Sequence, residues 1–281
     1  MPFMGHADTI DSPAASGLRG LPRRTRVALL WTAGAVILLA VFAHRMRAPV
    51  YNVFADQVTC LGIPNFTNVA SNLAFVLAGV VALAWFWRER SRLLGTRFRS
   101  RTELALYASF FAAAVLVGIG SGYYHWRPTN ATLFWDRCPM TLAGAALAGA
   151  FLAERVDTRA GAIVAVALAL LLPATLVYWR MSEAAGAENL WPYLAGFYGS
   201  LAVATLVLVL FPSPFTHGSQ AFVAVAWFAA AMPFDKALDG WVYSLGGITG
   251  GHAVKHLLAG LAMFWLFWFM LRPRVLRGVP T

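Results

Sequence analysis

Long apolar segments recur along this chain of 281 residues, and they restrict the folds that it can adopt. A helix that crosses a lipid bilayer needs about 20 mostly apolar residues. Hydrophobic residues make up 59% of the chain and charged residues only 12%. We therefore predict an all-α fold, a polytopic transmembrane helix bundle with a seven-helix core and one additional N-terminal hydrophobic segment. The eight candidate spans are residues 27–43, 67–87, 103–124, 133–153, 160–179, 191–211, 219–235 and 252–271.

Composition divides the chain into four regions. Residues 1–26 are rich in Pro, Ser, Gly and Arg, which predicts a flexible basic N-terminal tail. Residues 27–43 are expected to form an extra transmembrane helix, or alternatively a signal peptide that is cleaved near Ala43. Residues 50–271 should form the seven-helix membrane domain. Residues 272–281 should form a basic cytoplasmic tail.

The net charge of +10 is concentrated in three arginine clusters. With eight spans, all three clusters fall on the same side of the membrane, as the positive-inside rule requires of cytoplasmic segments. This placement argues against a nucleic-acid partner and indicates an integral, multi-pass protein, with a bacterial inner membrane as the expected location. The clusters are Arg19, Arg23, Arg24 and Arg26; Arg88, Arg90, Arg92, Arg97, Arg99 and Arg101; and Arg272, Arg274 and Arg277.

Five polar residues lie in or beside the apolar segments, where ionisable groups are costly and usually functional. They are Ser121, His125, Asp136, His252 and His256. His252 and His256 are one helical turn apart and share a helix face, and the predicted topology brings all five residues to the exoplasmic side. Catalytic zinc is held by three protein ligands and an open position. Helix-to-helix hydrogen bonds or a proton relay would be the alternatives to a zinc site.

Four stretches of the sequence resemble the alkaline ceramidase family. They are GIPNFTNVASNLAF from Gly62 to Phe75, SGYYH from Ser121 to His125, DRCPM from Asp136 to Met140, and GHAVKH from Gly251 to His256. That family belongs to the wider CREST group of seven-helix membrane hydrolases, which includes the adiponectin and progestin receptors. The resemblance covers residues 50 to 271, so the segment at 27–43 lies outside it.

The resemblance implies a zinc-dependent hydrolase that cleaves the amide bond of ceramide-like lipids within the bilayer and releases a fatty acid and a sphingoid or related amine. It assigns His125, His252 and His256 to Zn²⁺, Ser121 to the developing oxyanion or the reacting water, and Asp136 to general-base catalysis. The pair Arg137-Cys138 departs from the family, in which Glu-Leu would precede Pro-Met. The acidic N-terminal cluster that binds Ca²⁺ in eukaryotic members is not evident, because only Asp56 and Gln57 offer side-chain oxygens there besides the Asn residues that follow. The sequence therefore gives little reason to expect Ca²⁺.

Several roles stay open at this stage. Asp136 could instead orient a ligand histidine, and Ser121 could be a small packing residue beside Gly118, Gly120 and Gly122. Lys255 is expected to point away from the histidine face and reach the membrane interface. The protein as a whole could be a receptor-like or lipid-binding membrane protein with structural zinc, or a transporter. Two polar groups could serve either structure or the site: Asp235, Lys236 and Asp239, and Asn65, Asn68, Ser71 and Asn72.

Overall fold

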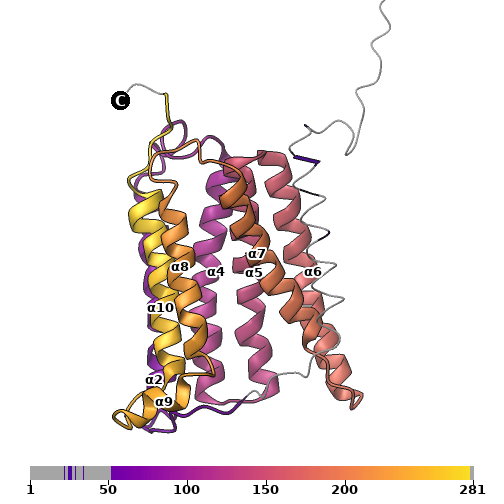
Figure 1. Cartoon of the computed structure of the whole chain (residues 1–281), viewed down its shortest axis with the longest axis vertical. Coiled ribbons are helices and arrows are strands. Elements are labelled where there is room, and N and C mark those ends of the chain that lie inside the picture. Colours follow the sequence, from indigo (N-terminus) through magenta and orange to yellow (C-terminus); the bar gives the residue numbers. More distant parts are fainter. Residues whose placement is uncertain (1–21, 23–24, 27–28, 30–33, 35–51, 279–281) are drawn as a thin grey trace, which may run out of the picture.

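The described residues form helices and no strands (Figure 1). The structure is a computed structural model that describes residues 22, 25–26, 29, 34 and 52–278. Apart from positions 29 and 34, the predicted span at 27–43 and its signal-peptide alternative lie outside these residues, as does most of the predicted tail at 1–26. The helices are α2 (Phe66–Ala70), α3 (Leu73–Arg88), α4 (Arg101–Trp126), α5 (Asn130–Arg155), α6 (Thr158–Ala184), α7 (Trp191–Leu210), α8 (Gln220–Ala231), the 3₁₀ turn η2 (Met232–Phe234), α9 (Asp239–Ser244), α10 (Gly251–Trp265) and the π-helical turn η3 (Leu266–Leu271).

Five helical segments of the described part are long and apolar enough to cross a membrane. The chain is therefore compatible with a multi-pass membrane protein. Two of the predicted spans do not meet this standard: α5 carries charged residues near both of its ends, and α8 has only 12 residues before η2. The five qualifying segments are Phe66–Arg88, Arg101–Trp126, Thr158–Ala184, Trp191–Leu210 and Gly251–Leu271.

Side-chain caps determine where the central helices begin. The Ser100 side chain accepts a hydrogen bond from the Glu103 backbone N–H and starts α4. Thr129 and Thr132 form a reciprocal capping box that starts α5, which satisfies backbone donors that the first helical turn leaves unpaired. Only residues 127–129 connect α4 to α5, so these two helices are antiparallel neighbours. Asp136 lies in the second turn of α5, because α5 starts three residues before the predicted position 133.

The helices pack as a ring around an internal cavity. α4 packs against α3 and α5; α5 packs against α7; α7 touches α8; α8 packs against α10; and α10 returns to α3. α6 lies outside this ring against α5 and α7 (Figure 1), and no residue of α6 lines the cavity. The ring, rather than a solid core, is what creates room for a ligand among the helices.

Large apolar side chains cover the outside of the bundle. Leu116 on α4, and Val166, Leu170 and Leu171 on α6, are half or more exposed. A soluble monomer rarely exposes apolar patches of this extent, whereas lipid tails are as apolar as leucine. The outer surface thus agrees with the apolar lengths of the helices.

The two ends of the bundle differ in chemistry. The arginine-rich α3–α4 loop and the C-terminal segment meet at one end, where Arg97 donates a hydrogen bond to the Pro273 carbonyl at 2.9 Å and the Leu276 N–H to the Thr96 carbonyl at 3.2 Å. α2 and α9 lie at the opposite end (Figure 1). Residues 272–278, for which the sequence predicts a tail, pack on the bundle, and Arg274 is fully buried.

Candidate metal centre

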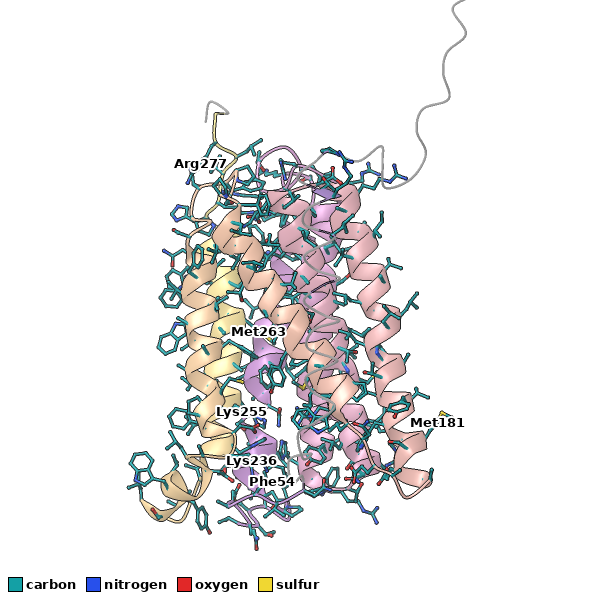
Figure 2. All side chains as sticks on the ribbon, turned by 45° about the vertical axis from the view of Figure 1, so that its right-hand side comes forward. Phe54, Met181, Lys236, Lys255, Met263 and Arg277 are labelled. Carbon is teal, nitrogen blue, oxygen red and sulfur yellow. The ribbon has the colours of Figure 1, made fainter. Side chains whose placement is uncertain are left out.

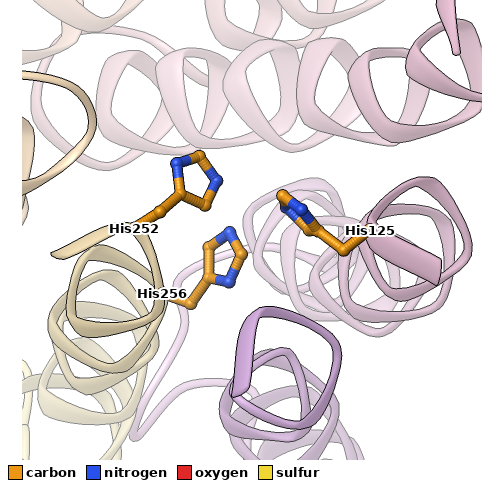
Figure 3. Close-up of side chains that lie close together, drawn as sticks. All are labelled: His125, His252 and His256. Atoms are coloured by element: carbon orange, nitrogen blue, oxygen red, sulfur yellow. The ribbon is translucent and has the colours of Figure 1, made fainter. Parts of the chain in front are cut away.

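Three histidines from two helices converge at the α2/α9 end of the bundle. His125 lies in the last turn of α4, and His252 and His256 lie in the first two turns of α10. One nitrogen from each ring can be chosen so that the three atoms lie within 4.8 Å of one another, and all three side chains are buried. Figure 3 shows the rings pointing toward a common centre. The predicted convergence of the histidines is therefore present, and the group could hold a metal ion.

The partners of His252 determine which of its nitrogens can bind a metal. Lys255 Nζ lies 3.1 Å from His252 Nε2, and an ammonium group can only donate, so Nε2 carries the lone pair. Nδ1 then carries the proton and donates a hydrogen bond to Asp235 Oδ1 at 2.9 Å. A carboxylate on the far nitrogen of a ligand imidazole is the usual arrangement in zinc proteins.

His256 is oriented by a hydroxyl group. Ser71 Oγ donates to the Asn68 carbonyl at 3.2 Å, which uses its one proton, and it therefore accepts from His256 Nδ1 at 2.9 Å. Nε2 of His256 is left with its lone pair toward the other rings. Ser71 comes from the short break between α2 and α3, so the polar sequence before α3 contacts the site directly.

His125 contributes an unsatisfied atom. Its Nδ1 is buried and has no hydrogen-bond partner among the described residues. A buried polar group without a partner is costly, and a bound cation would relieve this cost. The donor set of three imidazoles, two of them with assigned Nε2 lone pairs, fits Zn²⁺.

Asp239 fixes the start of α10. Its Oδ1 accepts from the His252 backbone N–H and its Oδ2 from the Ala55 N–H, both at 2.9 Å. A Cβ atom on Gly251 would lie 2.8 Å from the Asp239 backbone, so only glycine permits this close approach between α9 and α10. The carboxylate thus ties the 52–58 segment to the helix that carries two of the histidines.

Phe54 covers the histidines at the end of the bundle. Its ring centroid lies 4.6 Å from that of His125 and 4.7 Å from that of His252, both in edge-on geometry. Lys236 donates to the neighbouring Val53 carbonyl at 3.0 Å and lies over the same ring. Figure 2 places Phe54 and Lys236 at this end, with Lys255 further inside.

Ser121 and Asp136 line the same cavity as the three histidines, and both are buried. The cavity has a volume of about 410 Å³, within the range of small-molecule sites. The carboxylate that contacts a triad imidazole belongs to Asp235, whereas Asp136 Oδ2 lies 3.5 Å from Arg137 Nε. Ser121 and Asp136 are thus positioned beside the triad without an orienting contact to it.

The predicted direction of Lys255 is wrong. Its side chain is 14% exposed, lines the cavity and pairs with Asp235 Oδ1 at 2.7 Å. Residues three apart on a helix are neighbours, so the spacing from His252 to Lys255 already contained the signal.

The other polar residues whose role the sequence left undecided make structural contacts near the site. Asn65 donates to the His125 carbonyl at 2.8 Å and so joins α2 to the end of α4. Asn72 donates to the Asn68 carbonyl at 2.7 Å, which is a contact within its own segment. Asp56 is buried and accepts hydrogen bonds from Val58, Thr67 and Asn68, so its carboxylate holds the start of α2.

Comparison with known proteins adds no family to this description. No protein-family profile matches the chain, and no curated protein sequence matches it.

Proposed function

We propose that the protein is a zinc-dependent intramembrane hydrolase that cleaves the amide bond of ceramide-like lipids. The observation that carries the proposal is the buried group of three histidines, His125, His252 and His256, at one end of an apolar cavity. The sequence resemblance to alkaline ceramidases supports the choice of an amide substrate.

Zinc held by three neutral imidazoles supplies Lewis-acid chemistry, because it polarises a carbonyl group and lowers the pKa of water to about 7. The protein must supply the rest. Asp136 would accept a proton from the attacking water and later deliver it to the leaving amine. Ser121, one turn before His125 on α4, would donate a hydrogen bond to the developing oxyanion.

The cavity would bind the acyl chain. Away from the charged end it is lined by apolar side chains such as Phe110 on α4 and Phe151 on α5. Met263, which also lines it, lies further from the end of the bundle than Lys255 does (Figure 2). An amide at the histidines would thus have its fatty acid in the apolar part of the cavity.

We further propose that seven helices cross the membrane. Besides the five qualifying segments, α5 and α8 would cross it, packed between their neighbours in the ring. Charged residues near the ends of α5 would lie at the interfaces, and the short α8 would continue through η2. The arginine-rich end would be cytoplasmic and the histidine end exoplasmic, as in a bacterial inner membrane.

The test is metal content and turnover measured on one purified preparation. We expect about one zinc per chain, at Zn–N distances of about 2.0–2.1 Å, and release of fatty acid from an N-acyl sphingoid base. Removal of zinc should abolish turnover, and re-addition should restore it. His256→Ala should lose both zinc and activity. Protein that hydrolyses the lipid equally well without metal would refute the proposal.

Asp136 separates an enzyme from a receptor-like protein that holds structural zinc. Asp136→Asn keeps size and hydrogen bonding but cannot accept a proton, so turnover should fall about 10²–10⁴-fold while zinc content stays at the wild-type level. A protein with full zinc and no turnover on any lipid amide, in wild type as in variant, would instead be a lipid-binding protein.

A further inference from the structure

The charged side chains of the cavity gather at the histidine end and are mostly basic. Arg137, Lys236 and Lys255 line the cavity there, together with two acids, Asp136 and Asp235. Lys236 is exposed to solvent, and the part-buried cations Arg137 and Lys255 are balanced by Asp136 and Asp235. A bound Zn²⁺ with neutral imidazoles would then give this part of the cavity an excess of two positive charges. Uncompensated charge in an apolar cavity is costly, so this end should favour an anionic ligand.

Lys255 retains capacity to bind such a ligand. Its ammonium group has three donors, of which Asp235 accepts one at 2.7 Å. A second points at His252 Nε2, 3.1 Å away, which is the nitrogen that the tautomer of His252 leaves for a metal. A metal on that nitrogen would leave this donor for an acceptor in the cavity.

Arg137 contributes the second cation from a different helix. It lies on α5, with Asp136 Oδ2 3.5 Å from its Nε and the Tyr193 ring centroid 5.9 Å from its Cζ. It lines the same cavity as Lys255 and Asp235. A planar guanidinium binds carboxylate and phosphate oxygens in pairs, which an ammonium group does not.

We propose that the lipid amide bound in this cavity carries an anionic oxygen group on its amine side, close to the amide nitrogen, and that Arg137 and Lys255 bind that group. The inference rests on the proposed function for the position of the amide at the histidines. Because Lys255 lies one turn from His252 and contacts its ring, the anionic group has to lie within a few bonds of the amide. An N-acyl amino acid, whose carboxylate is on the carbon next to the nitrogen, is the simplest lipid with this arrangement.

The experiment compares the binding of three lipids with the same acyl chain. N-oleoylglycine carries the carboxylate, N-oleoylethanolamine is its neutral counterpart, and N-oleoylphosphoethanolamine carries a phosphate. Affinities are measured calorimetrically on the full chain in lipid nanodiscs, both zinc-loaded and zinc-free, so that direct binding of the anion to zinc is separated from binding by the side chains. We expect an anionic lipid to bind about 10–100-fold more tightly than the neutral one in the zinc-loaded form, as charge-assisted hydrogen bonds allow. The zinc-free form should keep a smaller preference, which is the part due to Arg137 and Lys255. The anionic lipid with the larger gain in affinity over N-oleoylethanolamine identifies the preferred group as carboxylate or phosphate.

Variants assign the preference to the two cations. Lys255→Gln and Arg137→Gln should each bring the affinity ratio toward one and leave the affinity for N-oleoylethanolamine nearly unchanged. Lys255→Arg should keep the preference, which shows that a loss in Lys255→Gln is a loss of charge rather than of folding. Arg180→Gln, which removes a charge on α6 outside the cavity, should have no effect on the ratio.

Equal affinities for the three lipids in wild type would overturn the inference, and so would a preference that survives in both Gln variants. A Lys255→Gln variant that loses turnover equally on all lipids with an unchanged binding ratio would make Lys255 an oxyanion donor instead. If the proposed function is wrong, the protein would still prefer anionic lipids but would bind no zinc and hydrolyse no lipid amide. Hydrolysis of the neutral lipid with no binding preference would leave the proposed function intact and refute the anionic substrate.

Discussion

His252 is held by contacts on both edges of its ring, since Lys255 meets Nε2 and Asp235 meets Nδ1. The two contacts together select one tautomer and one ring orientation. Asp235 also pairs with Lys255 at 2.7 Å. Asp235 therefore orients His252 directly, although it is not itself a proposed metal ligand.

We expect Asp235→Asn to weaken zinc affinity about 10–100-fold, because an amide is a poorer acceptor for the imidazole N–H than a carboxylate. Zinc affinity is measured by competition with a chelator of known affinity. Asp157→Asn, at the start of α6, is the control, since its side chain caps the helix at Ala160 and does not line the cavity. Unchanged zinc affinity in Asp235→Asn would mean that the geometry of α10 alone orients His252.

A glycine on α4 allows α4 and α5 to approach closely beside Ser121 and Asp136. A Cβ on Gly120 would lie 2.2 Å from the Trp135 carbonyl, whereas a Cβ on Gly122 would meet nothing within 4 Å. The close approach of α4 and α5 at Gly120 places Ser121 and His125 beside Asp136. Of the glycines around Ser121, Gly120 thus serves helix packing and Gly122 does not.

This contrast predicts opposite effects from two neighbouring substitutions. Gly120→Ala must separate α4 from α5 and should destabilise the protein by about 1–3 kcal/mol, the usual cost of overpacking. Gly122→Ala should be neutral or stabilising by up to about 1 kcal/mol, because alanine favours the helix over glycine. Thermal unfolding of both variants in detergent measures the difference. If the two alanine variants unfold at the same temperature, the α4–α5 contact is looser than these distances imply.

Arg274 connects the C-terminal segment to the bundle at the end opposite the histidines. Its guanidinium pairs with Glu103 at 2.8 Å and with Glu154, all three side chains being fully buried. The rings of Phe98, Tyr107 and Phe215 surround it. The segment after α10 is therefore an integral part of the fold.

Arg274→Gln should destabilise the protein by about 3 kcal/mol, because it removes the cation that the two buried carboxylates share and leaves them with the more distant Arg155, at 3.5 Å from Glu154, and Arg99, at 3.9 Å from Glu103. The thermal unfolding midpoint in detergent should fall accordingly. Arg277→Gln provides the matched control, since that side chain is exposed and its residue is held through the backbone N–H to Pro214. A variant Arg274→Gln that unfolds like wild type would show that the carboxylates find other partners.

Orientation in the membrane can be measured from two exposed loops at opposite ends. Ser91→Cys lies in the arginine-rich loop and Gly246→Cys follows α9, in a background where the free thiols Cys60 and Cys138 are replaced by serine. A membrane-impermeant maleimide added to intact cells should label position 246 only, since arginine-rich loops stay cytoplasmic. Labelling of position 91 instead would invert the topology and move the histidine end to the cytoplasm.

Local sequence was sufficient to predict where most helices lie and that His252 and His256 share a helix face. Apolar length predicts segments such as 103–124 within a few residues of α4, because helix formation in an apolar segment depends on near neighbours. The spacing of His252 and His256 places both rings on one face for the same reason. The number of membrane-crossing helices did not follow from apolar length alone, since α5 carries charged residues near both ends and α8 is short.

The contacts around the histidines required the folded chain. Ser71 meets His256 across 185 residues and Asp235 meets His252 across 17, and no local rule relates side chains at such separations. Phe54 reaches the site from a segment that precedes α2. Periodicity reports which face of a helix a residue occupies, but the partner on the other side of that face depends on how the helices pack. Apolar pattern and helical spacing therefore predicted most of the helices and the convergence of the three histidines, while packing of distant segments selected the groups that orient His252 and His256 and set the charge of the cavity.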